Sequence, residues 1–302
     1  MTGPAVGVLL PVAEGATTVK EAARRAEALG FDSIWLGDHL LPGYPVLDST
    51  ITLATAAAVT DTIAVGLSVY VPALRPLVWA AKQLATLQVV SDGRLVVGIG
   101  SGGPWPGEWD AAGVPHTERS RRTDLALERL PDLLAGAPTA LGDEDGSPVV
   151  TLAPAVTRPP FWIGGMSDVA IRRAATHGDA WFPSLVDAAT VARDGARLRR
   201  LAADRQRPTP GIAVGGTLAL GPDADIGPVV EGLVEGYGMD ADTAATIPFT
   251  GGSGQVAERI HAYAEAGADH LVVGAAAGPD WRRQYDLLAE ARAHLSSSPG
   301  SH

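Results

Sequence analysis

Short apolar runs alternate with amphipathic stretches of helical spacing along nearly the whole chain of 302 residues. Such alternation is typical of parallel βαβ units, and runs without polar interruption suit strands that are buried on both faces. Helical spacing separates apolar from charged side chains in the intervening stretches. About eight strands are predicted, at residues 6–10, 33–36, 62–69, 95–99, 161–163, 180–182, 212–220 and 270–274.

Eight strand–helix units at this length favour a closed barrel over an open, doubly wound sheet. We therefore predict an α/β fold, a (β/α)8 TIM barrel, as one domain over residues 1–295 with a flexible C-terminal tail at 296–302. Residues 136–160 hold five prolines and interrupt the rhythm. They are predicted to form a short irregular insertion, with one or two short strands, between strands 4 and 5.

Composition narrows the classes of function. The net charge of −11 makes nucleic acid an unfavourable partner, because an acidic surface repels phosphate backbones. The absence of cysteine excludes disulfides, thiolate zinc sites and cysteine nucleophiles, and fits a cytoplasmic protein. We expect no membrane span and no metal, since no apolar run is long enough and His39, His116 and His177 lack metal-ligand spacing.

Chemistry in such barrels lies at the carboxyl ends of the strands. Asp38 and His39 follow strand 2 and could form an acid/base or hydrogen-bonding pair, or a helix cap beside a half-buried histidine. The glycines of 100–103 follow strand 4 and let a ligand approach the backbone, or form a flexible loop. Pro104 and Pro106 follow where a helix should open, which disfavours a dinucleotide-binding motif.

The segment after strand 5 leads directly into a helix. Its glycines, Met166 and Ser167 could hold a phosphate at the helix N-terminus, although Ser167 could also be only an N-cap. Ser68 could line a pocket or simply end strand 3, and Trp181 could stack on a planar ring or close the core. Trp105 and Trp109 flank Glu108, which indicates either a substrate wall or a lid packed on the rim.

Four segments, in this order along the chain, resemble the luciferase-like flavin- and deazaflavin-dependent oxidoreductases. They are residues 31–40, residues 98–102 with Glu108 and Gly113, residues 160–165 with the Arg173 and 179–181 positions, and residues 262–271. The resemblance implies a (β/α)8 barrel that holds a flavin or deazaflavin ring in its mouth, with the cofactor phosphate near strand 5.

The resemblance also implies roles for single residues. Asp38 and His39 would approach the ring or substrate, with His39 the best candidate for proton transfer. In several relatives the position of Ser68 and Val69 holds a non-proline cis peptide bond against the ring. The remaining cofactor contacts would come from Gly100, Ser101, Gly102, Gly164, Gly165, Met166, Ser167 and Trp181.

Two departures bear on the cofactor and the substrate. Gly103 stands where the family's deazaflavin-dependent sugar-phosphate dehydrogenases carry an acidic residue, which argues against that substrate. The segment 163–165 is Ile-Gly-Gly, whereas the family's monooxygenases often carry Gln-Ala-Gly, so coenzyme F-420 is favoured over FMN.

The resulting hypothesis is hydride transfer between reduced F-420 and a small organic substrate, with His39 or Glu108 handling the proton. The alternative is an FMNH2-dependent monooxygenase that uses O2 and a separate flavin reductase. A flavin-free barrel is a third reading. The helices predicted at 47–59 and 77–90 are apolar enough to form a homodimer interface or to be ordinary barrel-packing helices.

Overall fold

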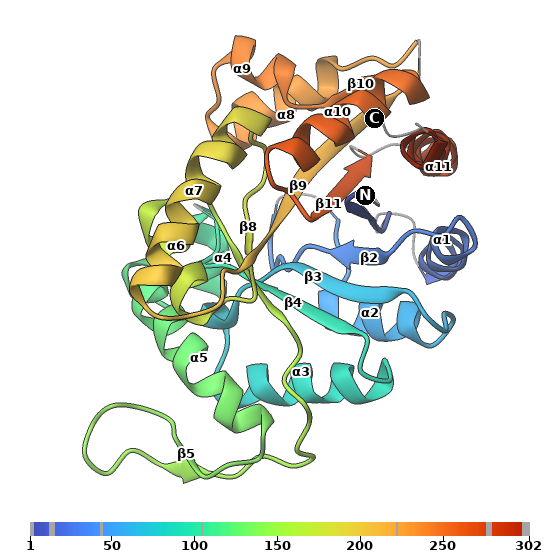
Figure 1. Ribbon diagram of the computed structural model, residues 1–302. Helices are drawn as coiled ribbons and strands as arrows, with labels where there is room; N and C mark the ends of the chain where they lie inside the picture. The colour runs from blue at the N-terminus through green and yellow to red at the C-terminus, as the bar shows by residue number, and fades with distance from the viewer. Residues whose placement is uncertain are drawn as a thin grey trace.

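The barrel predicted from the sequence is confirmed. The computed structural model describes residues 3–11, 16–42, 45–103, 105–221, 223–275 and 280–297. Eight parallel strands close into a barrel, with helices packed around it (Figure 1). In barrel order these strands are β1 (Ala5–Leu9), β2 (Ser33–Leu36), β3 (Ala64–Tyr70), β4 (Leu95–Ile99), β7 (Phe161–Gly164), β8 (Ala180–Phe182), β9 (Gly211–Leu220) and β11 (His270–Ala275).

A helix follows each barrel strand, as the alternation of apolar and amphipathic stretches predicts. These helices are α1 (Ala16–Ala28), α2 (Ser49–Ala57), α3 (Leu77–Val90), α5 (Arg119–Leu134), α6 (Asp168–His177), α7 (Ala188–Asp204), α10 (Ser253–Glu265) and α11 (Trp281–Ser297). Helix α11 runs to Ser297, two residues into the segment expected as a tail. Residues 298–302 lie outside the described residues.

Several short elements interrupt the regular pattern. The insertion at 136–160 holds the antiparallel pair β5 (Thr139–Ala140) and β6 (Val149–Val150), as expected. The strand 4 loop was predicted not to open a helix, and this is wrong: α4 (Pro106–Ala111) begins with Pro106, which suits the first helical turn. The sequence pattern did not indicate η1 (Pro72–Leu74), η2 (His116–Glu118), α9 (Ala241–Thr246) or β10 (Phe249–Gly251). A further helix, α8 (Gly227–Tyr237), follows β9.

Residues 223–252 form an addition to the barrel. Strand β10 pairs in parallel with the last three residues of β9, and α8 and α9 pack beside it (Figure 1). A small apolar cluster that includes Val229, Leu233, Ala244 and Ile247 holds this segment together. The addition therefore lies at the carboxyl end of β9.

The barrel interior is filled mainly by aromatic rings. The ring of Trp35 lies 4.8 Å from that of Trp162 and 5.4 Å from that of Phe182. Trp35 fits only because its neighbour on β3 is Gly66, where a Cβ atom would come within 2.1 Å of the indole. This packing fills the barrel interior, and the candidate site lies at the carboxyl ends of the strands.

Candidate active site

His39, Glu108 and Trp105 come together at the carboxyl ends of β2 and β4. Nδ1 of His39 lies 3.6 Å from Oε1 of Glu108, and the His39 ring meets the Trp105 ring edge-on at 5.3 Å between centroids. The imidazole is partly exposed, whereas the carboxylate is buried. Nδ1 of His39 thus faces the Glu108 carboxylate at a distance longer than a hydrogen bond, and Nε2 has no hydrogen-bond partner among the described residues.

Glu108 also holds the loop that carries His39. Its Oε1 accepts hydrogen bonds from the backbone N–H groups of Leu40, at 2.8 Å, and Leu41, at 3.0 Å. Backbone donors satisfy much of the hydrogen-bonding capacity of a buried carboxylate, which is otherwise costly to desolvate. Since α4 supplies Glu108, this unforeseen helix is what brings the strand 4 loop onto His39.

Asp38 has a different environment from His39. Its buried carboxylate accepts bonds from both terminal nitrogens of Arg75, at 2.7 and 3.0 Å, from Ser49 Oγ at 2.9 Å and from the Val71 N–H at 2.9 Å. Asp38 thereby joins the ends of β2 and β3 to the start of α2. Arg75 was not foreseen from the sequence, because a loop arginine 37 residues away carries no local signal.

Val69 lies among glycines on the neighbouring strands. The Ser68–Val69 peptide bond is cis, as the resemblance implied. A Cβ atom at Gly100 would lie 2.4 Å from Val69 Cγ2, and one at Gly164 would lie 2.8 Å from Cγ1. These two glycines therefore make room for Val69, which itself is partly exposed and presents an apolar surface.

The strand 4 loop has a buried side and a partly exposed side. Gly102 has φ +78° and packs against Trp109, which is buried with Val71 and donates a hydrogen bond to the Gly103 carbonyl. Trp109 is therefore part of the rim packing, whereas Trp105 lies beside His39. Ser68 and Ser101 are partly exposed, with no hydrogen bond recorded for either hydroxyl within the described residues.

The loop after β7 has the geometry of an anion site. Gly165 has φ +110°, a conformation that L side chains rarely adopt, and Ser167 caps α6 by accepting the Ala170 N–H at 3.2 Å. The N–H groups of the first helical turn have no acceptor within the helix, so they can bind an anion. Asp168, the first residue of α6, is paired with Arg197, and Met166 is exposed.

Trp181 does not line the barrel mouth. It is fully buried in the apolar cluster between the barrel and its helices, and its indole N–H donates to the Gly165 carbonyl at 2.8 Å. Of the two readings of Trp181, closing the core fits this burial, and the indole supports the loop from behind through its hydrogen bond to Gly165. Phe182, the next residue, is the one that faces the barrel interior.

A second polar group lies at the amino ends of the strands and was also missed. Ser33 Oγ lies 2.8 Å from Nε2 of His270 and accepts the indole N–H of Trp35 at 2.6 Å. Burial lowers the pKa of His270 to about 4, so its imidazole is neutral at physiological pH. Both residues begin their strands, at the end of the barrel remote from His39.

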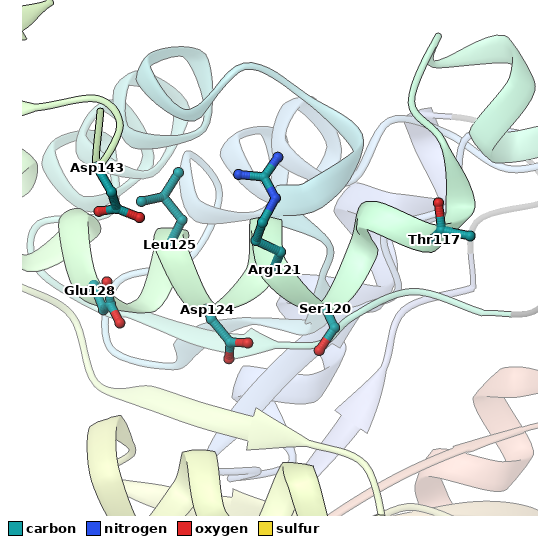
Figure 2. A pocket seen from close by; sticks show the side chains of 7 residues that line it. All are labelled: Thr117, Ser120, Arg121, Asp124, Leu125, Glu128 and Asp143. Carbon is teal, nitrogen blue, oxygen red and sulfur yellow. The ribbon is translucent and has the colours of Figure 1, made fainter. Parts of the chain in front are cut away.

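The outer face of α5 carries a surface cavity of about 430 Å³ (Figure 2). Two of its carboxylates are already paired, Asp124 with Arg173 and Asp143 with Arg129. The cavity therefore resembles a solvated groove between ion pairs. No group of three or more candidate ligands for a metal ion occurs among the described residues, and none of their helices is long and apolar enough to cross a membrane.

The sequence of this chain is similar to those of several known proteins. An uncharacterised protein of Mycobacterium tuberculosis is 28% identical over 252 residues, which cover 73% of this chain and 86% of the relative. An F420-dependent glucose-6-phosphate dehydrogenase of Amycolatopsis mediterranei is 36% identical over 94 residues, which cover 29% of this chain and 28% of that protein.

Solved structures agree on the fold. An F420-dependent secondary alcohol dehydrogenase superposes with a TM-score of 0.80 at 20% identity, covering 96% of this chain and 98% of that one. A long-chain alkane monooxygenase superposes with a TM-score of 0.80 at 15% identity, covering 100% and 93%. The family model described as luciferase-like monooxygenase matches residues 3–226. The chain therefore belongs to the luciferase-like monooxygenase family of oxidoreductases.

Proposed function

We propose that this protein transfers a hydride between reduced coenzyme F-420 and a small organic substrate at the carboxyl end of the barrel, with His39 as the proton-transferring residue. The observation that carries the proposal is the pairing of His39 with the buried Glu108 beside Trp105. A histidine oriented by a carboxylate and partly open to solvent is well suited to general acid/base chemistry.

The residues present fit a deazaflavin. Free N–H groups at the start of α6, beyond Gly165 and Ser167, suit its phosphate. Val69 offers an apolar surface for a planar ring, and Gly100 and Gly164 beside it carry no side chains that would compete for the space. The bound cofactor would supply the hydride, and the protein would supply binding, orientation and the proton.

Each residue then has a separate task. Glu108 holds the loop of residues 39–41 and orients Nδ1 of His39, so that Nε2 can donate or accept a proton. Trp105 shields one edge of the imidazole from water. Asp38 is a positioning residue, because Arg75 and Ser49 already occupy its oxygens, and it fixes the backbone on both sides of the mouth.

An FMN-dependent monooxygenase is the second candidate, favoured by the name of the matching family and by the alkane monooxygenase fold. The same phosphate loop and the same Val69 surface would serve FMN. This candidate differs in requiring reduced FMN from a separate reductase, and O2 as co-substrate. The local identity to an F420-dependent relative supports the deazaflavin instead.

A fluorescence titration of the purified protein with F-420 and with FMN tests the proposal. Tight binding of F-420 alone supports hydride transfer, whereas tight binding of reduced FMN supports the monooxygenase. Binding of neither refutes both candidates and supports a flavin-free barrel.

Variants then test the proton-transferring group. We expect His39→Gln to lower kcat by about 10²- to 10⁴-fold and to flatten its pH profile, with the affinity for the cofactor retained. His261→Gln is the matched control, since His261 forms an exposed pair with Glu265 on α10, 3.4 Å apart. If His39→Gln retained the activity of His261→Gln, the assignment of His39 would be wrong.

A further inference from the structure

The loops that follow the eight barrel strands are strongly acidic. Among the described residues they hold one basic residue, Arg75, and nine acidic ones. The count covers residues 10–11, 37–42, 45–48, 71–76, 100–103, 105–118, 165–167, 183–187, 221, 223–226 and 280. Both terminal nitrogens of Arg75 are bound to Asp38, so this guanidinium is not free to receive a ligand.

Arginines in the neighbouring helices are also occupied. In the first turns of α5 and α11, and beside the first residue of α6, four of them face carboxylates of the loops or of the adjacent helix. The pairs are Arg121 with Glu118, Arg283 with Asp280, Arg282 with Glu21 and Arg197 with Asp168. Arg119, the first residue of α5, instead contacts the ring of His116. Arg122 donates to the carbonyls of Ala73 and Arg75.

The opposite end of the barrel differs in charge. The loops that lead into the strands there hold four arginines, Arg94, Arg158, Arg205 and Arg207, against eight acidic residues. Both ends of the barrel are therefore net negative, and the mouth is the more negative of the two. Because a cleft lined by one sign of charge raises the local concentration of the opposite sign, the mouth favours cations and repels anions.

Apolar side chains are exposed on the same mouth loops. Leu40 is 49% exposed, Leu41 is 56% exposed and Met166 is 49% exposed. Trp105 adds a partly exposed indole beside His39. Large exposed apolar groups that surround a site are typical of ligand-binding surfaces.

We infer that the substrate of this enzyme is an uncharged or cationic molecule with an apolar body, and that phosphorylated and carboxylated substrates are rejected. The inference rests on the proposed function. An anion that entered this mouth would lose hydration, and the excess of carboxylates in the mouth loops would repel it. The phosphate of the cofactor can still bind, because backbone N–H groups at the start of α6 are available as hydrogen-bond donors to it.

Three probes of one shape and different charge test the inference: cyclohexanol, cyclohexylammonium and cyclohexanecarboxylate. Their dissociation constants are measured by ligand-observed NMR on the protein with and without F-420. We expect the carboxylate to bind at least about tenfold more weakly than the other two, with the gap narrowing as salt screens the charges. A carboxylate that bound as well as the alcohol, or three probes that all failed to bind, would overturn the inference.

A charge placed on the rim tests the cause. Leu41→Arg adds a free cation beside the His39 loop, where the side chain is exposed and only the backbone N–H is used by Glu108. This variant should bind the carboxylate probe about fivefold more tightly and the ammonium probe more weakly. Val149→Arg, at a 64% exposed position on β6, is the matched control and should change neither.

The two proposals fail separately. Loss of F-420 binding with the probe order intact refutes hydride transfer and leaves the charge selectivity of the mouth. Tight F-420 binding with turnover of a carboxylated or phosphorylated substrate refutes the charge selectivity and leaves hydride transfer.

Discussion

The Val69 packing predicts a large interaction between two substitutions that are each small. Gly100→Ala adds one methyl group, whose carbon would lie 2.4 Å from Val69 Cγ2. The other methyl carbon of the valine, Cγ1, packs over Gly98 and Gly164, where an added Cβ atom would lie 3.0 and 2.8 Å from it. Overpacking of this kind destabilises proteins by about 1–3 kcal/mol.

Removal of the valine methyls should cancel that cost. Val69→Ala deletes two methyl groups worth about 0.8 kcal/mol each when fully buried, and about 1 kcal/mol together at this partly exposed site. In the double variant the new methyl at position 100 meets only the Cβ atom of residue 69, at the ordinary distance of 3.5 Å. The double variant should therefore cost about 1 kcal/mol, which implies an interaction energy of about 1–3 kcal/mol.

Thermal unfolding measures this cycle. At this chain length 1 kcal/mol shifts Tm by about 2 °C, so Gly100→Ala should lower Tm by about 2–6 °C, and the double variant should lie only about 2 °C below the unsubstituted protein. Gly107→Ala in α4 is the control, because a Cβ atom there has nothing within 4 Å. Strictly additive effects of the two substitutions would refute the packing argument.

Three further predictions follow from ion pairs and burial. Asp38→Asn leaves Arg75 without its charge partner and should lower the free energy of unfolding by about 3 kcal/mol, measured by urea denaturation. Burial lowers the folded-state pKa of His270 to about 4, below its unfolded value of about 6.5. Arg292 adds to this effect, whereas Asp32 and Asp269 oppose it. As the pH falls, the unfolded state therefore binds the proton before the folded state does. The free energy of unfolding should be constant above about pH 6.5 and fall by up to about 3 kcal/mol between pH 6.5 and 4. His270→Gln should remove this pH dependence. Asp168→Asn frees Arg197 at the start of α6 and should bind the cofactor phosphate several-fold more tightly in the titration.

The barrel could be predicted from the sequence because parallel strands buried on both faces appear as uninterrupted apolar runs. β2, β4 and β8 have the bounds expected from the sequence. Because such runs are apolar throughout, the sequence does not indicate which side chains point into the barrel and which point toward the helices. Ala180, Trp181 and Phe182 are all apolar, so nothing in the sequence indicates that Trp181 faces the helices and Phe182 the interior.

The candidate site was only partly predictable. The strand-end rule correctly brought His39 and Glu108 to one end of the barrel, but their pairing depends on α4, a helix of six residues that is too short to show a period. The partner of Asp38 is a loop arginine fixed by tertiary contacts alone. Glycines at 98 and 100, two residues apart on one strand, share a face, and this spacing could have indicated that a neighbouring side chain fills the space above them.

The distribution of hydrogen bonds at the mouth limits what the protein itself can contribute to a reaction. Asp38 is bound by an arginine, a serine and a backbone N–H, and Oε1 of the buried Glu108 accepts two backbone N–H groups, so both carboxylates hold the mouth loops. The ring of His39 is partly exposed, and Nε2 of His39 has no hydrogen-bond partner among the described residues. Moving a single proton cannot change the oxidation state of a substrate, so the electrons of an oxidoreductase built this way must come from a bound cofactor. The two carboxylates then serve catalysis by holding His39 and its loop still, which is why we expect their replacement to affect kcat more than the affinity for the cofactor.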